Sequence, residues 1–159
     1  MPTDPPPPPA DAPAASGAPL DPYRAYNFRL DIQGVTKGYF TECFGLGVKV
    51  QSIAYREAGS GQVVRRLPGP VDYSSVTLRY GLVDASELWD WFTSGVRGNV
   101  KRKNLSIVMY KDEQDGKPGV QWDLLNAWVS EWRGAPLDTL GRDAAIESMT
   151  LVFESLERS

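Results

Sequence analysis

The sequence contains few of the side chains that carry out enzyme chemistry. It has 0 histidines and a single cysteine, Cys43, among its 159 residues. The absence of histidine excludes Ser-His-Asp and Cys-His nucleophiles, and a lone thiol excludes an intrachain disulfide and the common Cys/His zinc sites. Carboxylates such as Glu42, Asp123 and Glu131 remain as candidate acids or bases, but no motif selects a pair of them. The sequence therefore predicts no enzyme and no bound metal or cofactor.

Two short stretches resemble binding motifs only superficially. Residues 45–47 read Gly-Leu-Gly, but a phosphate-binding glycine loop opens a helix, and the residues that follow have the pattern of a strand. A turn or bulge is the better interpretation. The one basic cluster contains Arg97, Lys101, Arg102 and Lys103. It lacks the interleaved aromatics of a single-strand-binding groove, so a solvated joint or a subunit contact is favoured over a phosphate contact.

Charge and hydropathy narrow the function classes further. The net charge is −3, and the first 21 residues contain three Asp and no Lys or Arg, which leaves 17 acidic and 17 basic residues in the remainder. This neutral balance argues against a basic nucleic-acid binder. No apolar run is long enough for a membrane span or a signal peptide, so we expect no stable membrane insertion and synthesis in the cytoplasm.

Residues 1–22 form a separate low-complexity arm, and residues 23–159 form the predicted folded domain. The arm contains an unbroken run of prolines at positions 5–9, and Ala, Ser, Gly and Pro fill most of the rest. Such a composition favours disorder or polyproline II. A tether is the simplest role, and a proline-rich ligand is the alternative. We also hypothesise that the arm contacts the interior, a cap or cargo of a larger assembly, in which case deleting residues 2–20 would alter assembly or cargo loading.

Residues 84–95 are the one stretch with a clear helical pattern. Asp84 is a suitable N-cap, Leu88, Trp91 and Phe92 recur on one face, and Gly95 suits a left-handed stop. Nearly all other segments alternate with period two. We expect strands at residues 26–32, 37–44, 48–55, 75–81, 105–111, 119–132 and 145–156, with a bulge near positions 124–125 of the long one.

The longest predicted connection covers residues 56–74. Gly59 and Gly61 give it conformational freedom, residues 63–67 have the pattern of a short strand, and residues 68–70 read Pro-Gly-Pro. A connection of this length in a small domain is usually functional. We predict an arm that reaches a neighbouring subunit rather than a floppy hairpin. The candidate inter-subunit contacts are Glu57, Arg65, Arg66 and Leu67, together with Arg102 and Lys103 from the basic cluster.

Nine short motifs in order over residues 23–157 make this chain resemble the tail tube proteins of contractile phages, and especially the inner-tube proteins of extracellular contractile injection systems. They are Asn27-Phe28-Arg29-Leu30 with a following Gly34, Thr41-Glu42-Cys43-Phe44-Gly45-Leu46, Tyr55-Arg56-Glu57-Ala58-Gly59, Leu67-Pro68-Gly69, Leu78-Arg79-Tyr80-Gly81, Leu88-Trp89-Asp90-Trp91, Lys101-Arg102-Lys103-Asn104, Asn126-Ala127-Trp128 and Ala145-Ile146-Glu147. The proline-rich arm departs from the usual tube subunit. So does the last strand, because family members often carry His and Gly around the Glu at position 154.

The resemblance implies a mainly β, two-sheet antiparallel barrel or sandwich with one short flanking α-helix. Six subunits would form a ring, and rings would stack into a hollow conduit inside a contractile sheath. The implied partners are the sheath protein, baseplate, hub and tube-initiator proteins, a cap or terminator, and a luminal cargo of effector protein or DNA. The assembly would form in the cytoplasm as part of a phage tail or a released injection particle.

Two other readings remain open at this point. The tube protein of type VI secretion shares the implied architecture, although the motif order favours the phage-like tube. A β-barrel module for single-stranded nucleic acid would require a basic groove with stacked aromatics, and salt-dependent oligonucleotide binding would support it.

Overall fold

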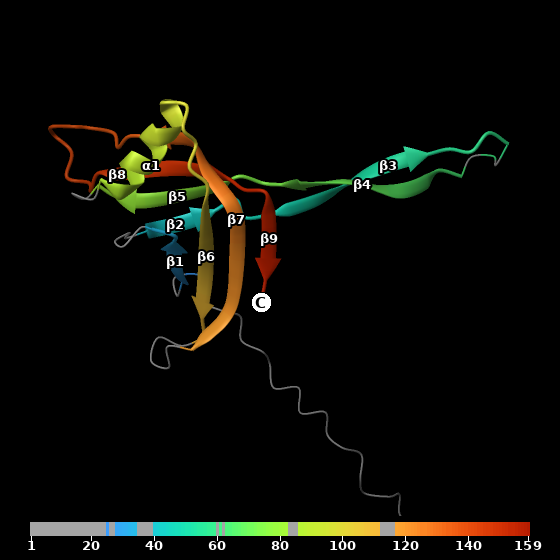
Figure 1. Ribbon diagram of the computed structural model, residues 1–159, viewed down its shortest axis with the longest axis horizontal. Coiled ribbons are helices and arrows are strands. Elements are labelled where there is room, and N and C mark those ends of the chain that lie inside the picture. The colour runs from blue at the N-terminus through green and yellow to red at the C-terminus, as the bar shows by residue number, and fades with distance from the viewer. Residues whose placement is uncertain are drawn as a thin grey trace, which may run out of the picture.

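The computed structural model describes residues 25, 28–34, 40–59, 61, 63–82, 86–111 and 117–159. The predicted arm at residues 1–22 lies outside this part of the chain. The described residues form nine strands and one helix (Figure 1). In chain order these are β1 Phe28–Ile32, β2 Phe40–Phe44, β3 Val48–Tyr55, β4 Arg65–Tyr73, β5 Val76–Gly81, α1 Glu87–Val96, β6 Lys103–Tyr110, β7 Pro118–Arg133, β8 Ile146–Val152 and β9 Ser155–Arg158.

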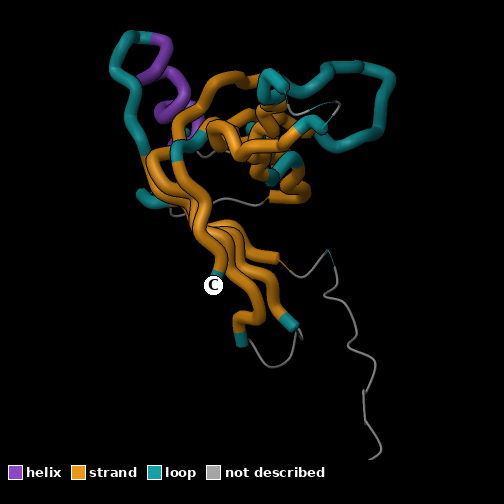
Figure 2. The backbone as a smooth tube through the Cα atoms, turned by 90° about the vertical axis from the view of Figure 1, so that its right-hand side faces the viewer, coloured by secondary structure: helices purple, strands orange, loops and turns teal. Residues whose placement is uncertain are grey.

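The long strand β7 takes part in two antiparallel sheets. Its first half pairs with β6 and β9, and β1 extends this first sheet beyond β6. Its second half pairs with β8, followed by β5 and β2 in the second sheet. The two sheets run in different directions and pack over a shared interior (Figures 1 and 2). The predicted mainly β, two-sheet architecture with one helix is confirmed.

A bulge lets β7 change sheets. Lys103 of β6 pairs with Ala127, and Leu105 pairs with Leu124, so β7 contains one extra residue at this point. Asn126 in that interval has φ 55°, the only positive value at a non-glycine residue in the described chain. An asparagine tolerates this left-handed conformation better than most residues. The bulge predicted near positions 124–125 is therefore confirmed, and it lies between Leu124 and Ala127.

The core follows the alternation predicted from the sequence. In β5, Val76, Leu78 and Tyr80 are buried, whereas Arg79 between them is exposed. Alternate residues of β1, β6, β7 and β8 close the same interior from the other strands. The largest fully buried side chains are Leu78, Leu105, Leu124, Met149, Leu151 and Val76.

Helix α1 covers one end of the sandwich, and its boundaries differ from the prediction. It begins at Glu87 rather than near Asp84, after Ser86, which makes no side-chain cap hydrogen bond. Gly95 lies inside the helix, and Gly98 takes the left-handed conformation with φ 84°. Boundaries depend on tertiary contacts as well as on capping residues, which explains the shift. The predicted apolar stripe is confirmed, since Leu88 and Trp91 are buried and Phe92 packs against the core.

The predicted strand at residues 145–156 is two strands in the structure. β8 ends at Val152 and β9 begins at Ser155, with Glu154 between them. The break has a physical cause, because the partner strand β7 changes sheets at the same level. β8 follows the second half of β7, and β9 follows the first half. The backbone N–H of Glu154 donates to the carbonyl of Leu125 at 3.1 Å and connects the β8–β9 junction to β7 at this corner.

About half of the connection predicted at residues 56–74 is strand. β4 occupies residues 65–73 and pairs with β3 along its length, so the connection proper ends before Arg65. Pro68 and Pro70 lie within β4 at a register irregularity between Val50 and Ser52 of β3. Proline is tolerated there because β4 is an edge strand and a bulge relieves the missing N–H donors. Residues 45–47 form an irregular connection between β2 and β3 and do not open a helix, and a Cβ on Gly45 would lie 2.5 Å from the carbonyl oxygen of Ser75.

Candidate subunit interface

The β3–β4 hairpin projects away from the sandwich along the longest axis of the molecule (Figure 1). Every residue of β3 is exposed, and β4 is exposed except at Gly69 and Tyr73. Among the described strands, β3 and β4 pair only with each other. An isolated two-stranded ribbon is marginally stable in water, because it buries little apolar surface. The hairpin therefore has the properties of a segment that another surface covers.

The hairpin carries an unusual share of the exposed apolar surface. Isolated exposed apolar residues are ordinary, but a contiguous set indicates a binding surface. Nine large apolar side chains on the hairpin or at its base are exposed in this way: Phe44, Val48, Val50, Ile53, Tyr55, Val63, Val64, Leu67 and Val71. Of this set, only Leu67 is among the contacts predicted from the sequence, because strand alternation does not reveal whether a face will be covered.

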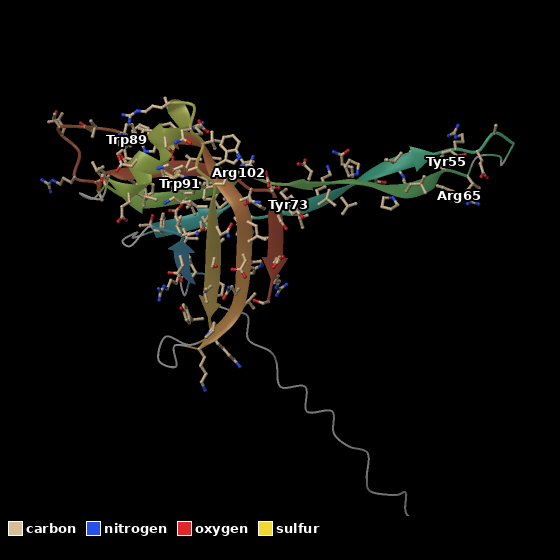
Figure 3. The ribbon with its side chains drawn as sticks, in the orientation of Figure 1. Tyr55, Arg65, Tyr73, Trp89, Trp91 and Arg102 are labelled. Atoms are coloured by element: carbon tan, nitrogen blue, oxygen red, sulfur yellow. The ribbon has the colours of Figure 1, made fainter. Side chains whose placement is uncertain are left out.

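Four of the six predicted contact residues lie together at the outer half of the hairpin. Arg65 and Leu67 are opposite Tyr55 and Ile53 in the strand register, and Glu57 lies two residues after the end of β3. Figure 3 shows Arg65 and Tyr55 near the far end of the ribbon. Because side chains alternate along a strand, Arg65 and Leu67 share one face and Arg66 occupies the other. The hairpin thus presents both charge and apolar surface on each side.

The other two predicted contact residues, Arg102 and Lys103, lie on the body and make contacts within the chain. The guanidinium of Arg102 forms an ion pair with Glu154. The amide of Asn126 donates to the same carboxylate at 3.0 Å. The ammonium of Lys103 lies 5.4 Å from the centre of the Trp91 ring. In the described structure these residues fasten the corner at which β7 changes sheets, and Figure 3 shows Arg102 far from the hairpin tip.

The loop between β7 and β8, at residues 134–145, is a second exposed apolar feature. The side chains of Leu137 and Leu140 are 88% and 92% exposed. Asp138 orders the turn between them: its carboxylate accepts the N–H of Leu140 at 2.9 Å, and its carbonyl accepts the N–H of Gly141 at 3.3 Å. Neither leucine was among the contacts predicted from the sequence. Two leucines in a segment that contains one proline and two glycines are the signal that could have found them.

The outer face of the second sheet is polar and its charges are locally compensated. Arg79 pairs with Glu42 at 3.1 Å, and Arg133 pairs with Glu131 at 2.8 Å. A depression of about 410 Å³ on this face is lined by four hydroxyl residues, by members of both ion pairs and by Phe44. The hydroxyl oxygens of Thr77 and Thr150 lie 3.4 Å apart within it. Such a surface offers little to an apolar ligand. The two carboxylates considered above as catalytic candidates are engaged in these ion pairs.

Another concave feature among the described residues is an apolar cavity of about 450 Å³ between the two sheets. Phe28, Cys43, Met109 and Trp122 are among its lining residues. Burial raises the pKa of the Cys43 thiol to about 11, so the thiol stays protonated and unreactive near neutral pH. Asp123, the third carboxylate candidate, accepts hydrogen bonds from Ser106 at 2.5 Å and from Gln121 at 2.8 Å. Within the described residues, no group of three potential metal ligands is found.

Comparison with known proteins identifies the family. The model of the family described as T4-like virus tail tube protein gp19 matches residues 24–157. This chain belongs to that family. No curated protein matches the sequence. Among the described residues, no helix is long and apolar enough to cross a bilayer.

Several solved structures of an extracellular contractile injection system contain chains with the same fold. A chain of the PVC sheath–tube complex in the extended state is 23% identical, with a TM-score of 0.78, and the match covers 87% of this chain and 91% of that one. A chain of the PVC sheath/tube terminator is 24% identical, with a TM-score of 0.79 and coverage of 89% and 99%. Hcp1 from Flavobacterium johnsoniae is more distant, with 13% identity, a TM-score of 0.52 and coverage of 84% and 94%. The tail tube fold predicted from the motifs is confirmed.

Proposed function

We propose that this tail tube protein forms hexameric rings that stack head to tail into a hollow conduit inside a contractile sheath. Its family supplies the tube assignment. Chains of the same fold occur in a PVC sheath–tube complex, in a six-fold symmetrised baseplate of the anti-feeding prophage and in its tube-terminating cap. By analogy, the partners are a sheath, a baseplate with its initiator proteins, and a cap. The role is structural rather than catalytic.

The edges of the two sheets support ring closure. β1 and β9 are the outer strands of the first sheet, and β2 is an outer strand of the second. Unpaired strand edges invite pairing with another chain, and proteins normally cover or pair them. A heterologous contact that closes after a fixed number of copies satisfies every edge without growth around the ring. Stacking along the axis remains open and produces a tube.

The exposed hairpin is the observation that carries the proposal. A ribbon with apolar side chains on both faces requires a partner surface, and a second copy is the partner that a repeating tube supplies. Glu57, Arg65, Arg66 and Leu67 then contact the neighbouring subunit. The polar, charge-compensated outer face of the second sheet meets the requirement for a channel wall along which cargo slides, whether that cargo is effector protein or DNA. Assembly in the cytoplasm precedes release or injection.

Electron microscopy of the purified full-length chain tests the proposal. Wild-type protein should form six-fold rings or hollow tubes. The double variant Arg65→Glu/Arg66→Glu should remain a folded monomer or ring that does not elongate. Each substitution replaces a positive charge with a negative one, so the charge at the contact falls by four units. The control Lys111→Glu/Lys117→Glu makes the same change in net charge on exposed residues of the body. Tubes of normal length from the hairpin variant would reject this role for the hairpin.

A further inference from the structure

The exposed apolar residues of the described chain fall into two groups at opposite ends of the molecule. One group belongs to the β3–β4 hairpin. The other belongs to α1, its flanking residues and the loop 134–145, at the opposite end of the long axis (Figure 1). This second group contains Leu82, Trp89, Val96, Val100, Leu137 and Leu140. Between these ends, the apolar side chains of the sandwich are largely inside the core.

We propose that the loop 134–145, named here the leucine loop, is the surface that receives the hairpin tip of the next copy in the stack. This inference rests on the proposed function, because it identifies the acceptor for the hairpin. Head-to-tail growth joins one end of a subunit to the opposite end of the next, so the two surfaces must be complementary to each other rather than to themselves. The leucine loop lies at the end that such a contact requires (Figure 1).

The leucine loop is ordered for binding before any partner arrives. The two hydrogen bonds accepted by Asp138 close a turn over residues 138–141, which contains Leu140 and directly follows Leu137. A preformed turn loses less conformational entropy on binding than an unstructured loop. Two almost fully exposed leucines on an ordered turn are the arrangement expected of an anchor that is buried in a complex.

The charges of the two ends are also complementary. The hairpin tip carries Arg56, Arg65 and Arg66 with a single acidic residue, Glu57. The leucine loop carries two acidic residues, Asp138 and Asp143, with a single basic residue, Arg142. All seven are exposed. Opposite net charges steer the two ends together and oppose the pairing of like ends, which favours head-to-tail over head-to-head stacking.

Site-directed crosslinking tests the contact in assembled tubes. In a Cys43→Ser background, Val64→Cys is introduced in the hairpin and Leu137→Cys in the leucine loop, singly and together. A short bismaleimide should convert the double variant into a ladder of covalent oligomers on a denaturing gel. The single variants should give no ladder. An intramolecular crosslink does not compete, because the two positions lie at opposite ends of the subunit (Figure 1).

A substitution pair measures the energetic contribution. Leu137→Ser/Leu140→Ser should fold with an unchanged melting temperature, since both side chains are exposed, but should raise the critical concentration for tube growth about tenfold or more. The conservative control Leu137→Met/Leu140→Met keeps the apolar surface and should form tubes normally.

Two outcomes overturn the inference while leaving the tube function intact. The first is that the double cysteine variant forms normal tubes but gives no ladder. The second is normal tube growth of the serine variant. If that variant grows normally but loses sheath recruitment, the leucine loop is assigned to the sheath. Failure of the wild-type chain to form rings or tubes would instead reject the proposed function itself.

Discussion

β5 and β3 are strands of similar apolar content in very different surroundings. β5 lies between β2 and β8, and the other sheet covers its apolar face, so Val76 and Leu78 are completely buried. β3 pairs only with β4 among the described strands, and about half of the surface of Val50 and Ile53 is exposed. Apolar burial is the main favourable term in folding and in association alike. In the body, apolar side chains are buried when the subunit folds. On the hairpin, apolar side chains stay exposed and can be buried when subunits assemble.

Removing a side chain from the centre of the body should have the largest effect. Leu78→Ala leaves a cavity in a fully enclosed site and should lower the free energy of unfolding by about 3 kcal/mol. Chemical denaturation, followed by tryptophan fluorescence at concentrations where the chain is monomeric, measures this loss. A change below about 1 kcal/mol would mean that the interior around β5 repacks freely, and would weaken the contrast with the hairpin.

The reactivity of the Cys43 thiol measures how well the body is shielded from solvent compared with the hairpin. Its pKa is raised to about 11 by burial, so alkylation at about pH 8 should be roughly a hundredfold slower than in the unfolded chain. Because the folded state holds this proton more tightly than the unfolded state does, stability is full below the unfolded pKa of about 8.5 and falls as pH rises toward 11. Stopped-flow alkylation and pH-dependent denaturation measure the two effects.

A matched control places the thiol on the hairpin. Cys43→Ser/Ala54→Cys moves it to an exposed position of β3, where alkylation of the monomer should proceed at the rate of a free cysteine. Because Cys43→Ser removes the thiol with the raised pKa, the variant should not lose stability as the pH rises from about 8.5 toward 11. Equal alkylation rates at positions 43 and 54 in the monomer would show that Cys43 is not buried as described.

An apolar-to-polar change on the hairpin should have the smallest effect on the subunit and a decisive effect on the assembly. Ile53→Ser should change the free energy of unfolding of the monomer by less than about 0.5 kcal/mol, because half of the side chain is already exposed. Tube growth, measured by light scattering and electron microscopy, should nevertheless be lost. A large loss of monomer stability with normal tubes would reverse the assignment of this surface.

Local patterns predicted much of the body because strands covered on one face alternate strictly. The buried positions of β1 and β5, the apolar stripe of α1 and the bulge in β7 all follow from such patterns. The helix start and the continuity of the last strand were predicted wrongly, because both depend on contacts with distant segments. Glu154 reads as part of one strand until its partner β7 changes sheets at Asn126.

The candidate interface was predictable only in part. The length of the connection and its Gly and Pro residues indicated a functional projection, and four of the predicted contacts do lie on the hairpin. The basic residues Arg102 and Lys103 had the same composition as a contact patch, yet they lie beside Glu154 and Trp91 in the fold. Charge in a sequence does not show whether a side chain is solvated, pairs within its own chain or contacts another subunit.

By itself, the sequence determined the strand periodicity, the helix, the absence of histidine chemistry and the ordered motifs of a tube protein. Only the tertiary structure decided which apolar residues remain uncovered. Val76 and Val50 are chemically identical and both lie in alternating strands, but one is fully buried and the other is half exposed. The reason is physical: burial is a property of the surfaces that meet in three dimensions, and the hairpin extends beyond the reach of the second sheet (Figure 1).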